Sequence, residues 1–212
     1  MSELEAPWHI YSHHFNDNRV LSKPKSEITC KKVGEGYELP LVLKSPEATP
    51  PVLKPEVNEP SAYWGTVGFH VFRTHLVKDH EVPVLIGYAW NTQKGKEGLD
   101  AFVGLRKPRE NSDWKPEGKT TFSISILKFE SNQKIEKSSF ALDVPNMKVT
   151  EGNDVYSVVK LSKVTGGKGE WEFKAETSDK KKDLLGWIIP PTPDGKEKAI
   201  KLVIKRWKGY GR

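Results

Sequence analysis

Short runs of alternating apolar and polar residues, separated by glycine, proline, asparagine and aspartate, dominate this chain. Residues 121–129 alternate phenylalanine and isoleucine with threonine and serine, the period-2 pattern of a strand with one buried face. Residues 170–177 and 200–205 show the same alternation. Two other runs, 67–77 and 82–90, are more continuously apolar, which predicts central strands covered on both faces.

Five further β-like segments bring the expected total to about ten strands. They are residues 37–43, 99–105, 139–144, 155–161 and 184–189. Turn-forming residues divide these segments at regular intervals, and no convincing amphipathic helix is found. The pattern therefore predicts an all-β fold, an antiparallel β-sandwich with little helix.

The domain organisation depends on how the proline-rich stretch 44–60 is interpreted. It holds five prolines in seventeen residues, and a proline cannot donate a ladder hydrogen bond. If the stretch were a linker, residues 1–43 would form a domain of about 45 residues, too small without disulfides or metal. We therefore expect an extended loop at 44–60 within a single β-sandwich domain that covers residues 1–212.

The composition bounds the cellular context. No apolar run approaches the roughly 18 residues that a membrane-spanning helix needs. The N-terminus has neither a cationic nor an apolar signal region. Cys30 is the only cysteine, which excludes an intramolecular disulfide. We expect a protein that is cytoplasmic as synthesised, and release by a route without a signal peptide stays open.

Catalytic signatures are scarce in this sequence. It contains no G-x-S-x-G elbow, P-loop or H-E-x-x-H motif. Six histidines are present, but their spacing on extended chain does not converge on one point as a metal site requires. We expect a non-catalytic protein with no cofactor and no bound metal.

The excess of positive charge is confined to the C-terminal segment 196–212. This segment holds seven Lys or Arg residues and one acid, whereas residues 1–195 carry 27 of each sign. Its last part, KRWKGYGR, predicts an anion-binding cluster in which cations surround two aromatic rings. A solvated tail is the alternative. The predicted anion-binding residues are Lys205, Arg206, Lys208 and Arg212, next to Trp207 and Tyr210.

Seven tryptophans in 212 residues is a high number. Tryptophan and tyrosine suit wet–dry boundaries, because one part of the ring is apolar and another forms hydrogen bonds. The alternative for each residue is a place in the β core. The predicted ligand-binding residues lie near expected strand ends or loops: Trp64, Tyr88, Trp90, Trp114, Trp207 and Tyr210.

A G-x-V-G strand at Gly65, a short loop, an apolar strand and an aromatic segment follow one another within residues 65–105. This order resembles the middle of the actinoporin and fungal fruit-body lectin superfamily, and residues 199–204 are similar to its closing strand. The resemblance implies a compact β-sandwich that binds phosphocholine lipids or glycans. Of the contact residues it implies, Tyr88 and Trp90 are present. The N-terminus does not resemble the pore-forming helix of the actinoporins.

These observations favour a non-catalytic binding module, lectin-like or cytolysin-like. Its expected partner is a membrane lipid headgroup or a glycan, contacted by loop aromatics and the basic C-terminal edge. The alternative is a structural or assembly protein, such as a virion, tail or coat component, that forms homo-oligomers. Its basic tail would then contact nucleic acid or an acidic subunit.

Overall fold

Strands account for nearly all regular structure in the computed structural model. The model describes residues 3–14, 20–21, 27–40, 49–78, 82–95, 98–108, 114–128, 135–163, 171–176, 182–189, 191–192, 194–197 and 200–207. These residues form seventeen strands and one short 3-10 turn, η1 (Glu3–Glu5). The predicted all-β fold with little helix is therefore confirmed, with more strands than the expected ten. Each of the ten expected segments overlaps a strand.

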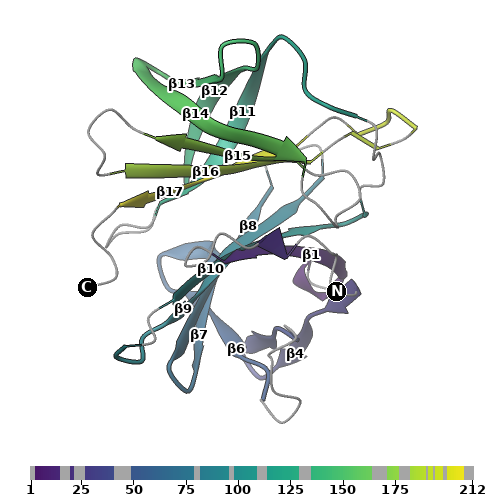
Figure 1. The fold of residues 1–212 in the computed structure, drawn as a ribbon. Coiled ribbons are helices and arrows are strands. Elements are labelled where there is room, and N and C mark those ends of the chain that lie inside the picture. The colour runs from purple at the N-terminus through teal and green to yellow at the C-terminus, as the bar shows by residue number, and fades with distance from the viewer. Residues whose placement is uncertain are drawn as a thin grey trace. The chain divides into compact units, whose positions relative to one another are not determined.

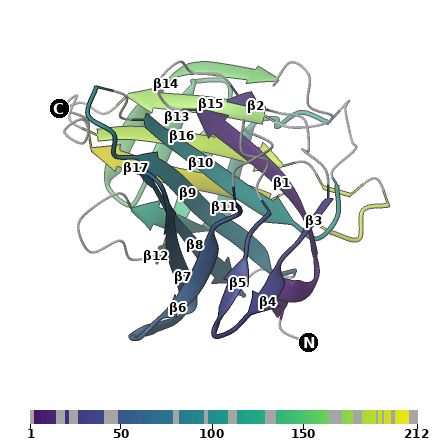
Figure 2. The ribbon, with the colours of Figure 1, turned by 90° about the horizontal axis from the view of Figure 1, so that it is seen from below.

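The chain divides into two compact units, Met1–Pro108 and Arg109–Arg212, where the sequence predicts one domain over 1–212. The first unit is one antiparallel sheet in the order β2-β1-β10-β9-β8-β7-β6-β5-β4, with β3 also paired to β1 (Figures 1 and 2). Its strands are β1 (Pro7–His14), β2 (Val20–Leu21), β3 (Glu27–Thr29), β4 (Lys31–Val33), β5 (Gly36–Glu38), β6 (Val52–Glu56), β7 (Glu59–Val67), β8 (His70–Val77), β9 (Val84–Asn91) and β10 (Gly98–Leu105).

The sheet of the first unit curls nearly into a barrel, and Cys30 marks the place where its two ends meet. Strand β3, just before this residue, pairs with β1, and β4, just after it, pairs with β5. One nearly continuous segment therefore touches both ends of the sheet. Closing a sheet in this way leaves few exposed edges, which protects it from pairing with other chains.

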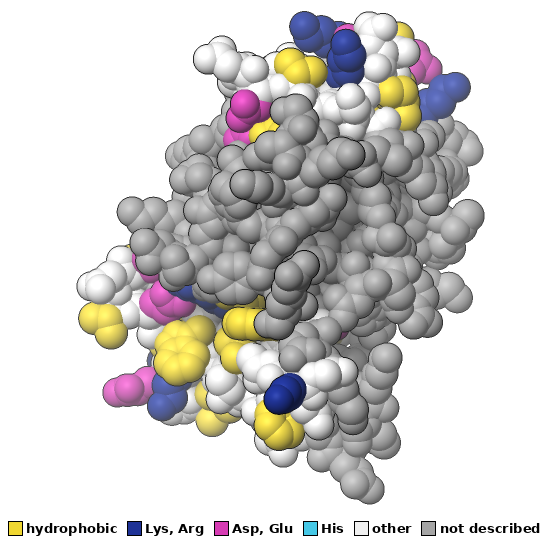
Figure 3. All heavy atoms as spheres, turned by 60° about the vertical axis from the view of Figure 1, so that its left-hand side comes forward, with side chains coloured by type: hydrophobic (Ala, Val, Ile, Leu, Met, Phe, Trp, Pro, Cys, Tyr) yellow, Lys and Arg dark blue, Asp and Glu magenta, His cyan; other side chains and the backbone are white. Residues whose placement is uncertain are grey.

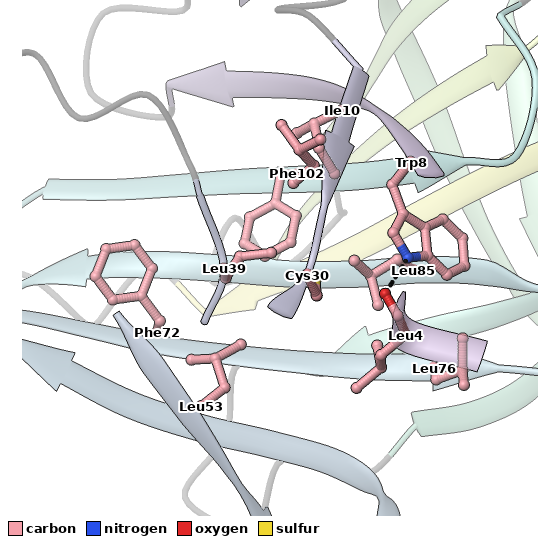
Figure 4. Packing of buried hydrophobic residues seen from close by; sticks show 11 residues of the cluster. Leu4, Trp8, Ile10, Cys30, Leu39, Leu53, Phe72, Leu76, Leu85 and Phe102 are labelled. Atoms are coloured by element: carbon pink, nitrogen blue, oxygen red, sulfur yellow. Dashed lines mark hydrogen bonds between the residues drawn. The ribbon is translucent and has the colours of Figure 1, made fainter. Parts of the chain in front are cut away.

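The interior of this curled sheet is filled by side chains from almost every strand. Figure 4 shows Trp8, Leu85, Leu39 and Phe72 among the buried residues that face one another there. Close packing leaves no room for a side chain at Gly87, where a Cβ atom would lie 2.3 Å from Cζ of Phe102. The indole Nε1 of Trp8 donates a hydrogen bond of 3.2 Å to the Leu4 carbonyl oxygen, which ties η1 to β1.

Strands β8 and β9 are buried on both faces, as their apolar sequences predict. Phe72 and Leu85 belong to the interior cluster. On the opposite face of the sheet, His75, Ile86 and Tyr88 are each 3% exposed or less. Pro83 directly precedes β9, a position where the missing backbone N–H of proline interrupts no ladder.

The second unit is a closed barrel of β11 to β17. All neighbouring strands are antiparallel except β11 and β17, which close the barrel as a parallel pair. Its strands are β11 (Lys119–Lys128), β12 (Ile135–Asp143), β13 (Lys148–Glu151), β14 (Asp154–Lys163), β15 (Trp171–Glu176), β16 (Lys182–Ile189) and β17 (Ile200–Trp207). Its buried cluster includes Phe140, Leu142, Val149 and Ile188.

The proline-rich stretch 44–60 is not the extended loop that its composition predicts. Residues 41–48 lie outside the described residues, but β6 and the start of β7 fall within the remainder of the stretch. Pro55 lies at a register shift between β6 and β7. A bulge is one of the few places where a strand accepts proline, because the ladder is already interrupted there.

Candidate functional site

Three of the predicted ligand-binding residues lie on one face of the first unit. In the register of the sheet, Trp64 of β7 is opposite Arg73 of β8, which is in turn opposite Tyr88 of β9. Directly opposed residues of antiparallel strands point to the same side. Trp90, two residues after Tyr88, shares this side. All three aromatic residues lie within strands, whereas the sequence predicts contacts from loops.

These aromatic residues differ in exposure. Trp64 is 48% exposed, Trp90 is half-buried and Tyr88 is only 2% exposed. Tyr88 lies in the middle of β9, between β8 and β10, and its ring is therefore not available as the surface contact that the sequence predicts. Trp64 is the aromatic residue of the three that offers a large surface to solvent.

Charged residues surround Trp64 on the neighbouring strands. Lys54 of β6 is opposite it and is exposed. Nη2 of Arg73, on the other side, lies 2.6 Å from Oε2 of Glu56 and 3.6 Å from Oε2 of Glu59. We call this set of five residues, Lys54, Glu56, Glu59, Trp64 and Arg73, the Trp64 face. Figure 3 shows, on one face of the molecule, hydrophobic side chains of described residues beside basic and acidic ones.

The formal charges of the Trp64 face cancel. Lys54 and Arg73 contribute two positive charges, and Glu56 and Glu59 contribute two negative ones. The Arg73 and Glu56 side chains are only 15% and 20% exposed, so this ion pair is held in place by its surroundings. A charge-assisted pair of this kind is a fixed set of hydrogen-bond donors and acceptors beside an exposed indole ring.

Strand β8 also carries buried polar atoms that lack a hydrogen-bond partner among the described residues. These atoms are Nε of Arg73, Oγ1 of Thr74 and Nε2 of His75. Burial, with a smaller contribution from the positive charge of Arg73, lowers the pKa of His75 to about 4. This imidazole is therefore neutral at physiological pH.

The remaining predicted site residues belong to the second unit or lie outside the described residues. Trp114 is half-buried and packs against the cluster around Phe140. Lys205, Arg206 and Trp207 are the last three residues of β17. The other predicted contacts, Lys208, Tyr210 and Arg212, lie outside the described part of the chain.

Sequence reasoning missed Lys54, Glu56, Glu59 and Arg73. Each is an ordinary charged residue in its own strand, and only the pairing of β6, β7 and β8 brings them to Trp64. Alternation within each strand is visible in the sequence, but it does not reveal which residues of two strands are opposite each other.

The comparisons with known proteins identify no relative. No protein-family model, no curated protein and no solved structure matches this chain. The resemblance of residues 65–105 to the actinoporin and fungal fruit-body lectin superfamily therefore stays a prediction. In the described residues, no three metal-ligating side chains are grouped to hold an ion, and no helix has the length and apolar character to cross a membrane.

Proposed function

We propose that this protein is a non-catalytic binding module whose ligand is a glycan, held at the Trp64 face. One observation carries the proposal: an indole ring that is nearly half exposed lies on a strand face between the exposed Lys54 and the Arg73–Glu56 ion pair. The C–H face of a sugar ring packs on an indole, and its hydroxyl groups need nearby donors and acceptors. Arg73 and Glu59 supply both kinds of group.

A lipid headgroup at a membrane surface is less well supported at this site. The charges of the Trp64 face sum to zero, so it has no excess of positive charge to attract an anionic membrane. The other exposed large hydrophobic residues of these hairpins are Val57, in the β6–β7 turn, and Phe69, in the β7–β8 turn. These turns are at opposite ends of β7, so the two side chains do not form one edge that could insert into a bilayer.

The experiment is a glycan array probed with the full chain, followed by calorimetric titration of the glycan that binds. Trp64→Ala should abolish binding, and Trp64→Phe should retain part of it, because a smaller ring still stacks. Phe69→Ala is the matched control: it removes an exposed aromatic ring outside the Trp64 face and should leave the affinity unchanged. Binding that survives in a folded Trp64→Ala variant would refute the assignment of the site.

The same preparation separates this function from the other two that the sequence suggests. Sedimentation velocity should give a monomer at micromolar concentration, both without ligand and with liposomes. Self-association without any ligand would favour the structural or assembly protein. Co-sedimentation with liposomes that lack glycolipid would favour recognition of a lipid headgroup.

A further inference from the structure

Trp90 lies beside the Trp64 face but is not one of its five residues. The pairing of β8 with β9 places Trp90 opposite Val71, and the pairing of β7 with β8 places Val71 opposite Thr66. These three residues form the row of the sheet next to the row that contains Trp64 and Arg73. Because alternate residues of a strand share a face, Trp64 and Trp90 lie on the same side of the sheet, two strands apart.

The row that contains Trp90 is accessible to a ligand. Thr66 is exposed, and Val71 and Trp90 are half-buried. On the other side of Trp64 along the strands, the next row is at most 3% exposed. That buried row consists of Ala62, His75 and Ile86. A ligand held on Trp64 can therefore extend over this face toward Trp90, but not toward the buried row.

The end of β9 that carries Trp90 is fixed to the β7–β8 turn. The backbone N–H of Thr92 donates a hydrogen bond of 2.8 Å to the carbonyl oxygen of Phe69, and the Thr92 hydroxyl donates one of 2.9 Å to the same oxygen. The Asn91 side chain accepts a hydrogen bond from the backbone N–H of Gln93. Trp90 is thus part of an anchored strand end, and a ligand that binds it does not have to order the backbone first.

The spacing of the two indoles limits which ligands can contact both. Neighbouring strands lie about 4.8 Å apart and each residue advances about 3.3 Å along a strand, so the Cα atoms of Trp64 and Trp90 are about 12 Å apart. One sugar ring that stacks on one indole cannot also stack on the other at this distance. Arg73 and Val71 of β8 lie between the two indoles. The Arg73 guanidinium has more N–H donors than its two carboxylate partners use, and sugar hydroxyl groups accept hydrogen bonds.

We propose that the ligand of the Trp64 face is a linear oligosaccharide of pyranose units, one of which stacks on Trp64 and another, further along the chain, on Trp90. This inference rests on the proposed glycan function and specifies the class of its ligand. Pyranoses whose hydroxyl groups are mainly equatorial present C–H faces that pack on an indole. A chain can place separate units on separate rings, so each ring adds a stacking contact of its own. A single sugar uses Trp64 alone.

The test is calorimetric titration of the full chain with cello-, xylo- and chito-oligosaccharides, each from disaccharide to hexasaccharide. In the wild type the affinity should rise about two- to tenfold once the chain reaches both indoles, because one aromatic stacking contact is worth a factor of this size. Longer chains should add nothing further. Trp90→Leu keeps an apolar side chain without a ring, and it should bind every length as weakly as the wild type binds a disaccharide.

Two other variants separate this inference from the function on which it rests. Trp64→Ala should abolish the binding of all lengths, whereas Trp90→Leu should remove only the gain that comes from length. Phe69→Ala is the matched control, because it removes an exposed aromatic ring from the turn to which the end of β9 is bonded, and it should leave the length dependence unchanged. Circular dichroism and thermal melting establish that each variant is folded.

Three results would overturn the inference. If the wild type binds all lengths of a series equally, only one sugar unit is in contact. If the folded Trp90→Leu variant keeps the gain from length, the second contact is not Trp90. If none of the three series binds, the ligand is not a chain of this kind. In each case, binding of another glycan from the array that is lost in Trp64→Ala leaves the proposed function intact, whereas an array without any bound glycan refutes both.

Discussion

His75 offers the sharpest test of the packing around β8. Its side chain is 3% exposed, and its register neighbours across the sheet, Ala62 and Ile86, are apolar. Its Nε2 atom has no hydrogen-bond partner among the described residues. A charged imidazole in this position would be desolvated and would lie near the positive charge of Arg73, which is why burial and this neighbour lower the pKa of His75 to about 4.

The consequence for stability follows from proton linkage. In the unfolded chain the imidazole has a pKa of about 6.5, so between this value and about 4 the unfolded state binds one more proton than the folded state. The free energy of unfolding therefore falls as the pH falls through this window. The loss from this one group is about 2 kcal/mol at pH 5 and about 3 kcal/mol at pH 4, relative to pH 7.

The measurement compares urea unfolding of the wild type, His75→Gln and His70→Gln at pH 7 and pH 5. His75→Gln should lose about 2 kcal/mol less stability than the wild type between these pH values, because glutamine does not titrate. His70 is an exposed residue of the same strand, so His70→Gln should show the wild-type pH dependence. An NMR titration that places the pKa of His75 above 6, or equal pH dependence for all three proteins, would refute the reasoning.

Two further predictions concern the first unit. Arg106 packs its guanidinium 3.7 Å from the centre of the Trp8 ring and donates hydrogen bonds to the carbonyl oxygens of Glu3 and Pro7. Arg106→Ala should therefore lower the free energy of unfolding by about 1–3 kcal/mol in urea titrations. If Arg106→Lys is as stable as the wild type, a positive charge at this position is sufficient and the contacts of the guanidinium are not needed. Burial raises the pKa of the Cys30 thiol to about 11. A thiol reagent at pH 8 should therefore label Cys30 in the native protein only as fast as the protein unfolds. Labelling of the native protein as fast as in denaturant would contradict the burial of Cys30.

The sequence predicted the strands best where one face of a strand is clearly apolar. The alternation in 121–129 and 170–177 corresponds to β11 and β15. The first strand, β1, was not identified, because its apolar residues are mixed with polar ones in the segment PWHIYSHH. Its membership of the sheet depends on pairing with β10, at the far end of the first unit. Such long-range pairing leaves no signal in a local window of sequence.

The sequence did not indicate the division into two units, for a different reason. The stretch 44–60 has the strongest linker composition in the chain, yet β6 and β7 lie within the first unit there. The two units meet in sequence at Pro108 and Arg109, where the local composition is unremarkable beside the proline-rich stretch. Prolines indicate where the hydrogen bonds of a strand ladder are interrupted. Such an interruption can be a bulge within a sheet as well as a linker between domains.

Strand register is the physical basis of the Trp64 face. Lys54 and Arg73 come to Trp64 only because these residues are opposite each other in the antiparallel ladders of β6, β7 and β8. A shift of one residue in either ladder would move every one of these side chains to the other face of its sheet. In each unit the packing of the apolar face selects the register, so the residues that form the core also determine which charged and aromatic groups lie together on the surface.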